Sequence, residues 1–229
     1  QAFMAGESVA WPADGDARRV SLPGYPFAED SHSLPRVVPG GGQVAQLHPL
    51  IGRNASDFES VRFEAVFTGE EFFLADHVVG ERRLLPGAAY LEMARAAGAE
   101  ALGQPVSALT HVAWLRPLVQ DIAPVRVSVV LERNGTGARF RIESAAGTHS
   151  EGNLTCESAP APERIDLDAI RAACPTERKA DDLYRFFAAS GLAYGRGFKA
   201  VARGWRGEGE ALAELVLPGG LDGRADGFV

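Results

Sequence analysis

The sequence predicts an α+β protein in which an antiparallel sheet wraps around one long helix, the arrangement called a hot-dog fold. Three patterns predict it: a strand over residues 61–68, a helix rich in small residues over residues 87–102, and a run of strands after that helix. A hydrophobic content of 46% over 229 residues is that of an ordinary globular protein, with ample material for a core.

The strand and the helix of the first half have clear periodicities. In residues 61–68 the apolar side chains alternate with Arg62, Glu64 and Val66, which predicts a half-buried strand with inward positions at Val61, Phe63, Ala65 and Phe67. In residues 87–102 the spacing of three to four predicts a helix whose core face holds Tyr90, Leu91, Ala94, Ala97 and Ala101. Small residues all round this helix predict that the sheet buries it deeply.

Further strands are predicted after the helix, at residues 112–118, 125–131, 138–143 and 149–156. Asn134-Gly135 between the second and third of these has the composition of a hairpin turn. The second half predicts a short helix at 166–173, an amphipathic helix at 181–190 that ends at Gly191, and strands at 200–205 and 210–217. It begins like another sheet-plus-helix unit, but no second long buried helix follows.

Composition excludes several classes of function. A net charge of −7 without a basic block argues against nucleic-acid binding, and the short Arg82-Arg83 and Arg178-Lys179 clusters are typical of solvated surface. No apolar run approaches the roughly 20 residues needed to span a bilayer, and residues at the start of this sequence lack the apolar region typical of a signal peptide. Two cysteines, Cys156 and Cys174, are too few for a disulfide scaffold or a zinc site, so we expect a reduced, cytoplasmic protein.

His77 is the main candidate for chemistry. Histidine is the side chain whose ordinary pKa makes it a ready proton acceptor near neutrality. A short loop follows His77, and the Pro86-Gly87 step then opens the long helix. A helix N-terminus offers unpaired N–H groups and a positive dipole end, which suit a polarised carbonyl. A base beside such a helix end is what removal of a proton next to a carbonyl needs, although a core-edge histidine bonded to the backbone is the alternative.

The other polar candidates are weaker. His48 is expected at a structural turn, and Asp76 is expected to be a cap or a surface residue, because it points away from His77 in an extended segment. The remaining histidines show no metal-ligand spacing, so no metal site is predicted: His32, His111 and His149. Tyr194, which Gly195 and Gly197 follow, is a second candidate for a cleft, with an aromatic-anchored turn as the alternative.

These residues resemble a known family. The segment from His77 to Pro86 resembles the HxxxGxxxxP motif of polyketide synthase dehydratase domains, and Tyr194 to Phe198 is similar to their YGPxF motif. Residues 67–76 and 90–94 resemble those of modules that lack an embedded acyltransferase (trans-AT type). Residues 48–52 are similar to the usual opening of the domain, and residues 22–27 are similar to the linker that trails an upstream ketosynthase.

The resemblance implies a double hot-dog fold and the loss of water from a β-hydroxyacyl thioester. His77 would be the general base, the Gly87 helix end would polarise the thioester carbonyl, and Gly80, Pro86 and Tyr194 would form the substrate site. No cofactor is implied, because the phosphopantetheine arm of an acyl carrier protein presents the substrate. Neighbouring synthase domains and a homodimer partner are also implied. The implied domains are a linker at 1–46, an N-terminal hot dog at 47–158, a linker at 159–175 and a partial C-terminal hot dog at 176–229.

The sequence departs from the family pattern in three places. Glu81 stands at the motif glycine, with Gly80 one place early, and Arg196 stands at the proline of YGPxF. The aspartate that would protonate the departing hydroxyl, in a DxxxQ or DxxxH motif, is absent, because neither Asp222 nor Asp226 is followed by Gln or His at that spacing. The chain, which begins at Gln1, is therefore expected to be a piece of a larger protein that stops before this motif. A double-bond-shifting isomerase, a cyclase and an inactive spacer domain remain alternatives.

Overall fold

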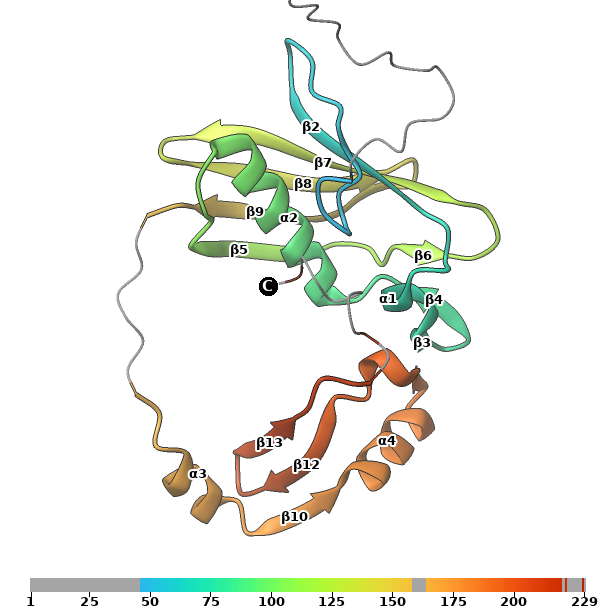
Figure 1. The fold of residues 1–229 in the computed structure, drawn as a ribbon, viewed down its shortest axis with the longest axis vertical. Helices are drawn as coiled ribbons and strands as arrows, with labels where there is room; N and C mark the ends of the chain where they lie inside the picture. Colours follow the sequence, from blue (N-terminus) through green and yellow to red (C-terminus); the bar gives the residue numbers. More distant parts are fainter. Residues whose placement is uncertain (1–45, 158–163, 220, 222–227, 229) are drawn as a thin grey trace, which may run out of the picture. The chain divides into compact units, whose positions relative to one another are not determined.

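The computed structural model describes residues 46–157 and 164–219, together with Leu221 and Phe228 (Figure 1). A six-stranded antiparallel sheet has the strand order β1-β2-β7-β8-β9-β5. Its strands are β1 (Arg53–Asn54), β2 (Val61–Phe67), β5 (Ala108–Trp114), β7 (Val125–Asn134), β8 (Gly137–Ser144) and β9 (Gly147–Thr155). Helix α2 (Gly87–Leu102) lies along one face of this sheet. The predicted α+β class and the helix against an antiparallel sheet are confirmed.

Helix α2 begins and ends where its sequence directs. Pro86 is its N-cap, and Gly103 ends it in the left-handed conformation with φ of 66°. The buried face is broader than predicted, since it also includes Met93 and Gly98. Ala101, which was predicted to face the core, is exposed. The reason is the wrapped sheet, which contacts a wider arc of the helix than a flat surface would. A Cβ at Gly98 would lie 2.8 Å from Leu154 Cδ2, so small residues let the sheet approach this closely.

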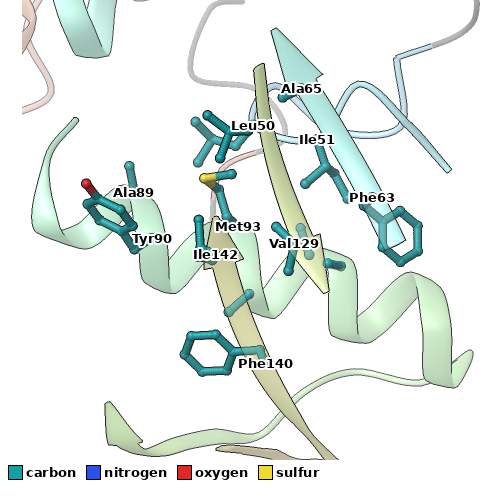
Figure 2. Packing of buried hydrophobic residues seen from close by; sticks show 14 of the residues in the cluster. Leu50, Ile51, Phe63, Ala65, Ala89, Tyr90, Met93, Val129, Phe140 and Ile142 are labelled. Carbon is teal, nitrogen blue, oxygen red and sulfur yellow. The ribbon is translucent and has the colours of Figure 1, made fainter. Parts of the chain in front are cut away.

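The core lies between α2 and the sheet. Figure 2 shows Met93 and Tyr90 of the helix beside Val129, Phe140 and Ile142 of β7 and β8. The Tyr90 hydroxyl accepts a hydrogen bond of 2.8 Å from the backbone N–H of Leu118, and burial raises the pKa of this phenol. The helix is therefore joined to the segment that follows β5 by a buried polar contact as well as by apolar packing.

The predicted strand at 112–118 was wrong in position, because β5 occupies Ala108–Trp114. Its pairing with β9 is shifted between Thr110 and Ala113, where His111 adopts a φ of 52°. After Trp114 the chain leaves the ladder, and the N–H groups of both Leu115 and Arg116 bond to the carbonyl of His149. Residues 115–118 therefore do not extend the sheet, and the N–H of Leu118 bonds to the Tyr90 hydroxyl, which alternation alone could not reveal.

Two smaller predictions also shift. The β7–β8 hairpin forms as predicted, but its two-residue turn is Gly135-Thr136, with Asn134 paired to Gly137. Of the four inward positions predicted for β2, three are buried, whereas Val61 is 39% exposed at the start of the strand. Strand ends receive less cover from α2, which the alternating pattern does not reveal.

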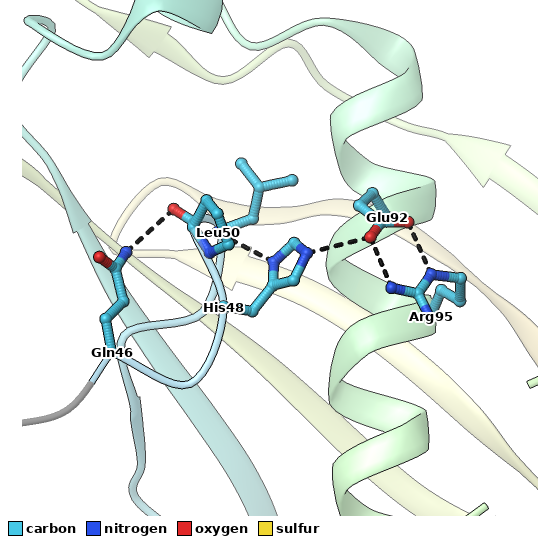
Figure 3. A network of polar contacts seen from close by, with 6 residues as sticks. Gln46, His48, Leu50, Glu92 and Arg95 are labelled. Atoms are coloured by element: carbon cyan, nitrogen blue, oxygen red, sulfur yellow. Dashed lines mark hydrogen bonds and ion pairs between the residues drawn. The ribbon is translucent and has the colours of Figure 1, made fainter. Parts of the chain in front are cut away.

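His48 lies at a turn, as predicted. The backbone groups of His48 and Ile51 bond to each other, and the N–H of Leu50 donates to His48 Nδ1 at 3.1 Å. His48 Nε2 lies 3.0 Å from Glu92 Oε1 of α2, and Arg95 binds the same carboxylate with two hydrogen bonds of 2.7 Å (Figure 3). This network ties the chain ahead of β1 to the helix.

The second half contains a three-stranded antiparallel sheet of order β10-β12-β13. Its strands are β10 (Thr176–Lys179), β12 (Val201–Arg206) and β13 (Ala211–Leu215), and α4 (Ala180–Ala189) contacts β10 and β12. The predicted short helix is α3 (Leu167–Ala173), whose first-turn N–H groups bond to Asp166 Oδ1. The Arg171 guanidinium lies 4.2 Å from the centroid of the Trp205 ring and links α3 to β12.

The predicted linker at 1–46 lies outside the described residues except for Gln46, and so do Asp222 and Asp226. None of the helices in the described ranges is long and apolar enough to cross a membrane.

Candidate active site

A small four-stranded sheet holds His77. Its order is β11-β3-β4-β6, formed by β11 (Leu192–Tyr194), β3 (His77–Val79), β4 (Arg82–Leu84) and β6 (Val119–Gln120). The short helix α1 (Phe72–Ala75) leads into β3. The segment interpreted from the sequence as a short loop is therefore a hairpin. The sequence signal for this hairpin was Gly80, which stands between the apolar pair Val78-Val79 and the short run that forms β4.

The hairpin turn explains why the motif prefers glycine. Val79 pairs with Arg82, so the turn residues are Gly80 and Glu81, and both have positive φ, 55° and 68°. A two-residue turn with both residues left-handed matches the twist of the strands and favours glycine. Glu81 is one of two described non-glycine residues with positive φ, so the backbone at Glu81 is strained.

Replacing Glu81 with glycine should stabilise the hairpin. The left-handed conformation costs a residue with a Cβ about 1–2 kcal/mol, and the greater freedom of glycine in the unfolded chain offsets part of this. We expect Glu81→Gly to raise the free energy of unfolding by about 0.5–1 kcal/mol, measured by urea denaturation. Glu70→Gly, at an exposed position whose φ is not positive, is the matched control and should not stabilise. An equal or lower stability of Glu81→Gly would contradict the strain.

A single hydrogen bond sets the tautomer of the His77 imidazole. Its Nδ1 lies 2.8 Å from the carbonyl oxygen of Leu84, across the hairpin. Because a carbonyl oxygen only accepts, Nδ1 carries the proton and Nε2 of the neutral ring has a free lone pair. The side chain is half-buried. His77 is therefore held in the tautomer in which Nε2 can take a proton.

Strand β11 places Tyr194 against His77. The two residues are paired in the antiparallel ladder, and their rings are stacked with centroids 5.6 Å apart. Phe198, from the turn η2 (Arg196–Phe198), lies 5.3 Å from the imidazole and 5.8 Å from Tyr194. The two aromatic rings pack on the imidazole and limit its rotation.

Asp76 joins the two strands. Its main-chain oxygen accepts from the N–H of Gly195 at 2.8 Å, and its carboxylate Oδ2 accepts from the N–H of Gly197 at 2.7 Å. The sequence predicted a cap or a surface residue, and Asp76 does follow α1 as its C-cap. The cap is therefore confirmed, and its carboxylate is also half-buried against the Tyr194 loop, a contact that the sequence did not indicate.

The N-terminus of α2 is close to His77 along the chain. Leu84, which binds the imidazole, is followed by Leu85, whose N–H bonds to the carbonyl of Leu118, and then by the buried Pro86. Pro86 provides no capping side chain, and Gly87 and Ala88 after it are exposed. The first backbone N–H groups of the helix are thus open to a ligand.

An apolar pocket of about 390 Å³ lies beside this helix end. Its wall includes Pro86, Ala88 and Ala89 from the start of α2, and Phe72 and Phe198 from the other side. Phe198, which lines this pocket, also packs against the His77 ring, although His77 itself is not one of the lining residues.

The structure places the predicted site residues in one region, the small four-stranded sheet and the start of α2. His77, Gly80 and Tyr194 lie in one small sheet that leads to Pro86 and Gly87. His149 is buried elsewhere, where Nδ1–H donates to the carbonyl of Arg116 and Nε2 accepts from Ser144 at 2.7 Å, and burial lowers the pKa of this imidazole. Sequence reasoning missed the contributions of Asp76, Leu84 and Phe198, because they depend on strand register.

Two family models match the chain. The model described as polyketide synthase dehydratase domain matches residues 48–145, and the one described as polyketide synthase dehydratase N-terminal domain matches residues 162–229. The polyketide synthase PksM of Bacillus subtilis is 33% identical over 237 residues, which cover 95% of this chain and 6% of PksM. The chain thus spans a small part of the length of this curated relative.

Solved structures of polyketide synthase dehydratase domains are also similar to this chain. A trans-AT polyketide synthase dehydratase domain from Brevibacillus brevis is 34% identical, with a TM-score of 0.74, over 81% of this chain and 69% of that one. The CurK dehydratase has a TM-score of 0.68 and 26% identity over 78% of this chain and 67% of that one, as an inactive mutant with phenylalanine in place of a histidine. A second inactive CurK mutant has asparagine in place of an aspartate.

The fold and these matches define an α+β protein of the double hot-dog class. The chain belongs to the family of polyketide synthase dehydratase domains.

Proposed function

We propose that this chain acts as the dehydratase domain of a modular polyketide synthase of the trans-AT type. It removes water from a β-hydroxyacyl thioester on an acyl carrier protein and leaves an α,β-enoyl thioester. One observation carries the proposal: His77 donates Nδ1–H to the carbonyl of Leu84, which leaves Nε2 free as a base, in a ring that packs on Phe198 of the apolar pocket. The inactive CurK mutant in which phenylalanine replaces a histidine supports a histidine as the essential group.

In the proposed mechanism, Nε2 of His77 takes the α-proton of the thioester. The electrons of the broken C–H bond form the new double bond, and the C–O bond to the β-hydroxyl breaks. The departing hydroxyl takes a proton and leaves as water. The open N–H groups at Gly87 and the helix dipole stabilise the negative charge that grows on the thioester oxygen. The inactive CurK mutant in which asparagine replaces an aspartate supports an aspartate as the acid that gives this proton to the hydroxyl.

The proposed substrate site consists of His77, Gly80, Pro86, Gly87 and Tyr194. The pocket at the start of α2 takes the apolar part of the acyl chain, because phenylalanine and alanine side chains line it. Proton transfer and carbonyl polarisation need no further group, so the proposed reaction uses no separate cofactor.

The proposed partners follow from the modular synthase. They are the acyl carrier protein, whose phosphopantetheine arm carries the substrate, the neighbouring domains of the synthase, and a second copy of the domain in a homodimer. The proposed domains are an N-terminal hot dog at 47–158 and a partial C-terminal hot dog at 176–229, joined through 159–175. Both cysteines are free thiols, which suits a protein of the reducing cytoplasm.

Mass spectrometry of the acyl carrier protein tests this function. The intact synthase module is given carrier protein loaded with either stereoisomer of a 3-hydroxyacyl group. We expect one stereoisomer to lose one water, and the product to absorb in the ultraviolet as a conjugated enoyl thioester. No loss of water from either stereoisomer would contradict a dehydratase. A 3-enoyl substrate that is converted to the conjugated isomer, while the hydroxyacyl substrates stay unchanged, would establish an isomerase instead.

A further inference from the structure

Asp76 contacts the aromatic loop, residues 194–198, whose Tyr194 and Phe198 rings pack on His77. It accepts one hydrogen bond from Gly195 through its main chain and one from Gly197 through its carboxylate. We propose that Asp76 is a positioning residue for the reaction: it holds this loop so that the rings of Tyr194 and Phe198 fix the imidazole with Nε2 toward the substrate. This inference rests on the proposed role of His77 as the base.

The register of β3 and β11 gives the first argument. Gly195 N–H donates to Asp76, and Gly80 N–H donates to Gly191 at the other end of the pair. In an antiparallel ladder, hydrogen-bonded pairs alternate with pairs whose side chains lie closer together. His77 and Tyr194 are next to the bonded pair Asp76–Gly195, so they form one of the close pairs. A slip by one residue would turn Tyr194 to the other face of the sheet.

The two glycines of the loop give the second argument. A Cβ at Gly195 would overlap the Oδ1 atom of Asp76, and a Cβ at Gly197 would lie 2.9 Å from Oδ2 and 3.2 Å from Phe72 Cδ2. Glycine at both positions therefore matches the presence of the carboxylate between the loop and α1. The two glycines of the Tyr-Gly-Arg-Gly-Phe sequence leave space for the Asp76 carboxylate.

The third argument concerns what the loop does for the imidazole. Leu84 fixes Nδ1, but one hydrogen bond still allows the ring to swing about its axis. Tyr194 and Phe198 both lie within 5.6 Å of the imidazole centroid, and their centroids are 5.8 Å apart. Removing the carboxylate frees the Gly197 end of the loop, and with it Phe198. The base would then sample orientations in which Nε2 misses the α-carbon.

The test compares Asp76→Ala with Asp76→Asn in the intact synthase module. Alanine removes the acceptor for Gly197 N–H, whereas asparagine keeps an oxygen at the same place. We expect Asp76→Ala to lower kcat about 10–100-fold, with KM changed less than about threefold, because orientation of the base affects the chemical step more than docking of the carrier. Asp76→Asn should retain most of kcat.

Hydrogen exchange of the peptide 192–198 provides a readout that does not depend on turnover. We expect faster exchange in Asp76→Ala and nearly normal exchange in Asp76→Asn. Asp166→Ala is the matched control, because it also removes an aspartate that accepts two backbone hydrogen bonds, at the start of α3. Its kcat and the exchange of 192–198 should be unchanged.

The measured kcat values and exchange rates either support or overturn the positioning role of Asp76. Normal kcat in Asp76→Ala, or loss of kcat to the same extent in Asp76→Asn, would overturn the positioning role. Normal exchange at 192–198 in Asp76→Ala would overturn the contact on which it depends. If the wild-type module dehydrates no hydroxyacyl substrate, the proposed function fails, and the exchange data alone then decide whether Asp76 holds the loop on His77.

Discussion

Replacing His77 with asparagine should lower kcat/KM for dehydration by about 10³-fold, because general-base catalysis contributes about 10²–10⁴. Asparagine is the sharpest substitution at this position. Its amide N–H can reach the carbonyl of Leu84 as Nδ1 does at 2.8 Å, but nothing replaces Nε2. The variant should therefore fold normally and bind the carrier-linked substrate without removing the α-proton. His77→Ala should also abolish turnover.

The measurement is the rate of water loss from a 3-hydroxyacyl group on the carrier protein, with thermal unfolding as a check of folding. His111→Asn is the matched control. His111 is exposed on β5, away from the small sheet, and its φ of 52° suits asparagine, so activity and stability should be kept. If His77→Asn retains activity within a few-fold of the wild type while the fold is intact, His77 is not the base.

The fold of the first half was predictable because its elements are strongly periodic. The helix 87–102 coincides with α2, since Pro86 and Gly103 punctuate both ends and the small residues between them signal close packing. The strand at 112–118 was misplaced because the decisive feature is tertiary. The N–H of Leu118 bonds to the Tyr90 hydroxyl and not to a neighbouring strand. No pattern within residues 112–118 indicates which hydrogen-bond acceptor the N–H of Leu118 takes.

The site was predictable at single residues but not as an arrangement. His77, Pro86 and Tyr194 stand out by residue type and motif. The partner that sets the tautomer is the backbone carbonyl of Leu84, which no side-chain pattern can indicate. The cap role of Asp76 was predicted, but its contact with the loop after β11 was not, because its direction was inferred from an isolated strand and the glycines that contact its carboxylate come from more than a hundred residues later.

Replacing Phe140 with alanine should cause the largest loss of stability, with a fall in the free energy of unfolding of about 3–5 kcal/mol. The ring has no exposed surface, and it lies in the core formed by β8 and α2 (Figure 2). A Cβ at Gly152 on β9 would lie only 2.8 Å from Phe140 Cε1, so the ring fills the space that glycine leaves. Alanine would leave a cavity that the flanking ladder cannot close. Urea denaturation of the two proteins measures the difference.

Phe58→Ala is the matched control, because Phe58 is fully exposed in the loop before β2 and the same truncation should change stability by less than about 0.5 kcal/mol. Gly152 offers a second check. Gly152→Ala alone should destabilise, because its Cβ meets the Phe140 ring, and the cost should be smaller in the Phe140→Ala background, where that ring is gone. Equal costs in both backgrounds would show that the ring does not pack over Gly152, and that the sheet wraps α2 by a different set of contacts.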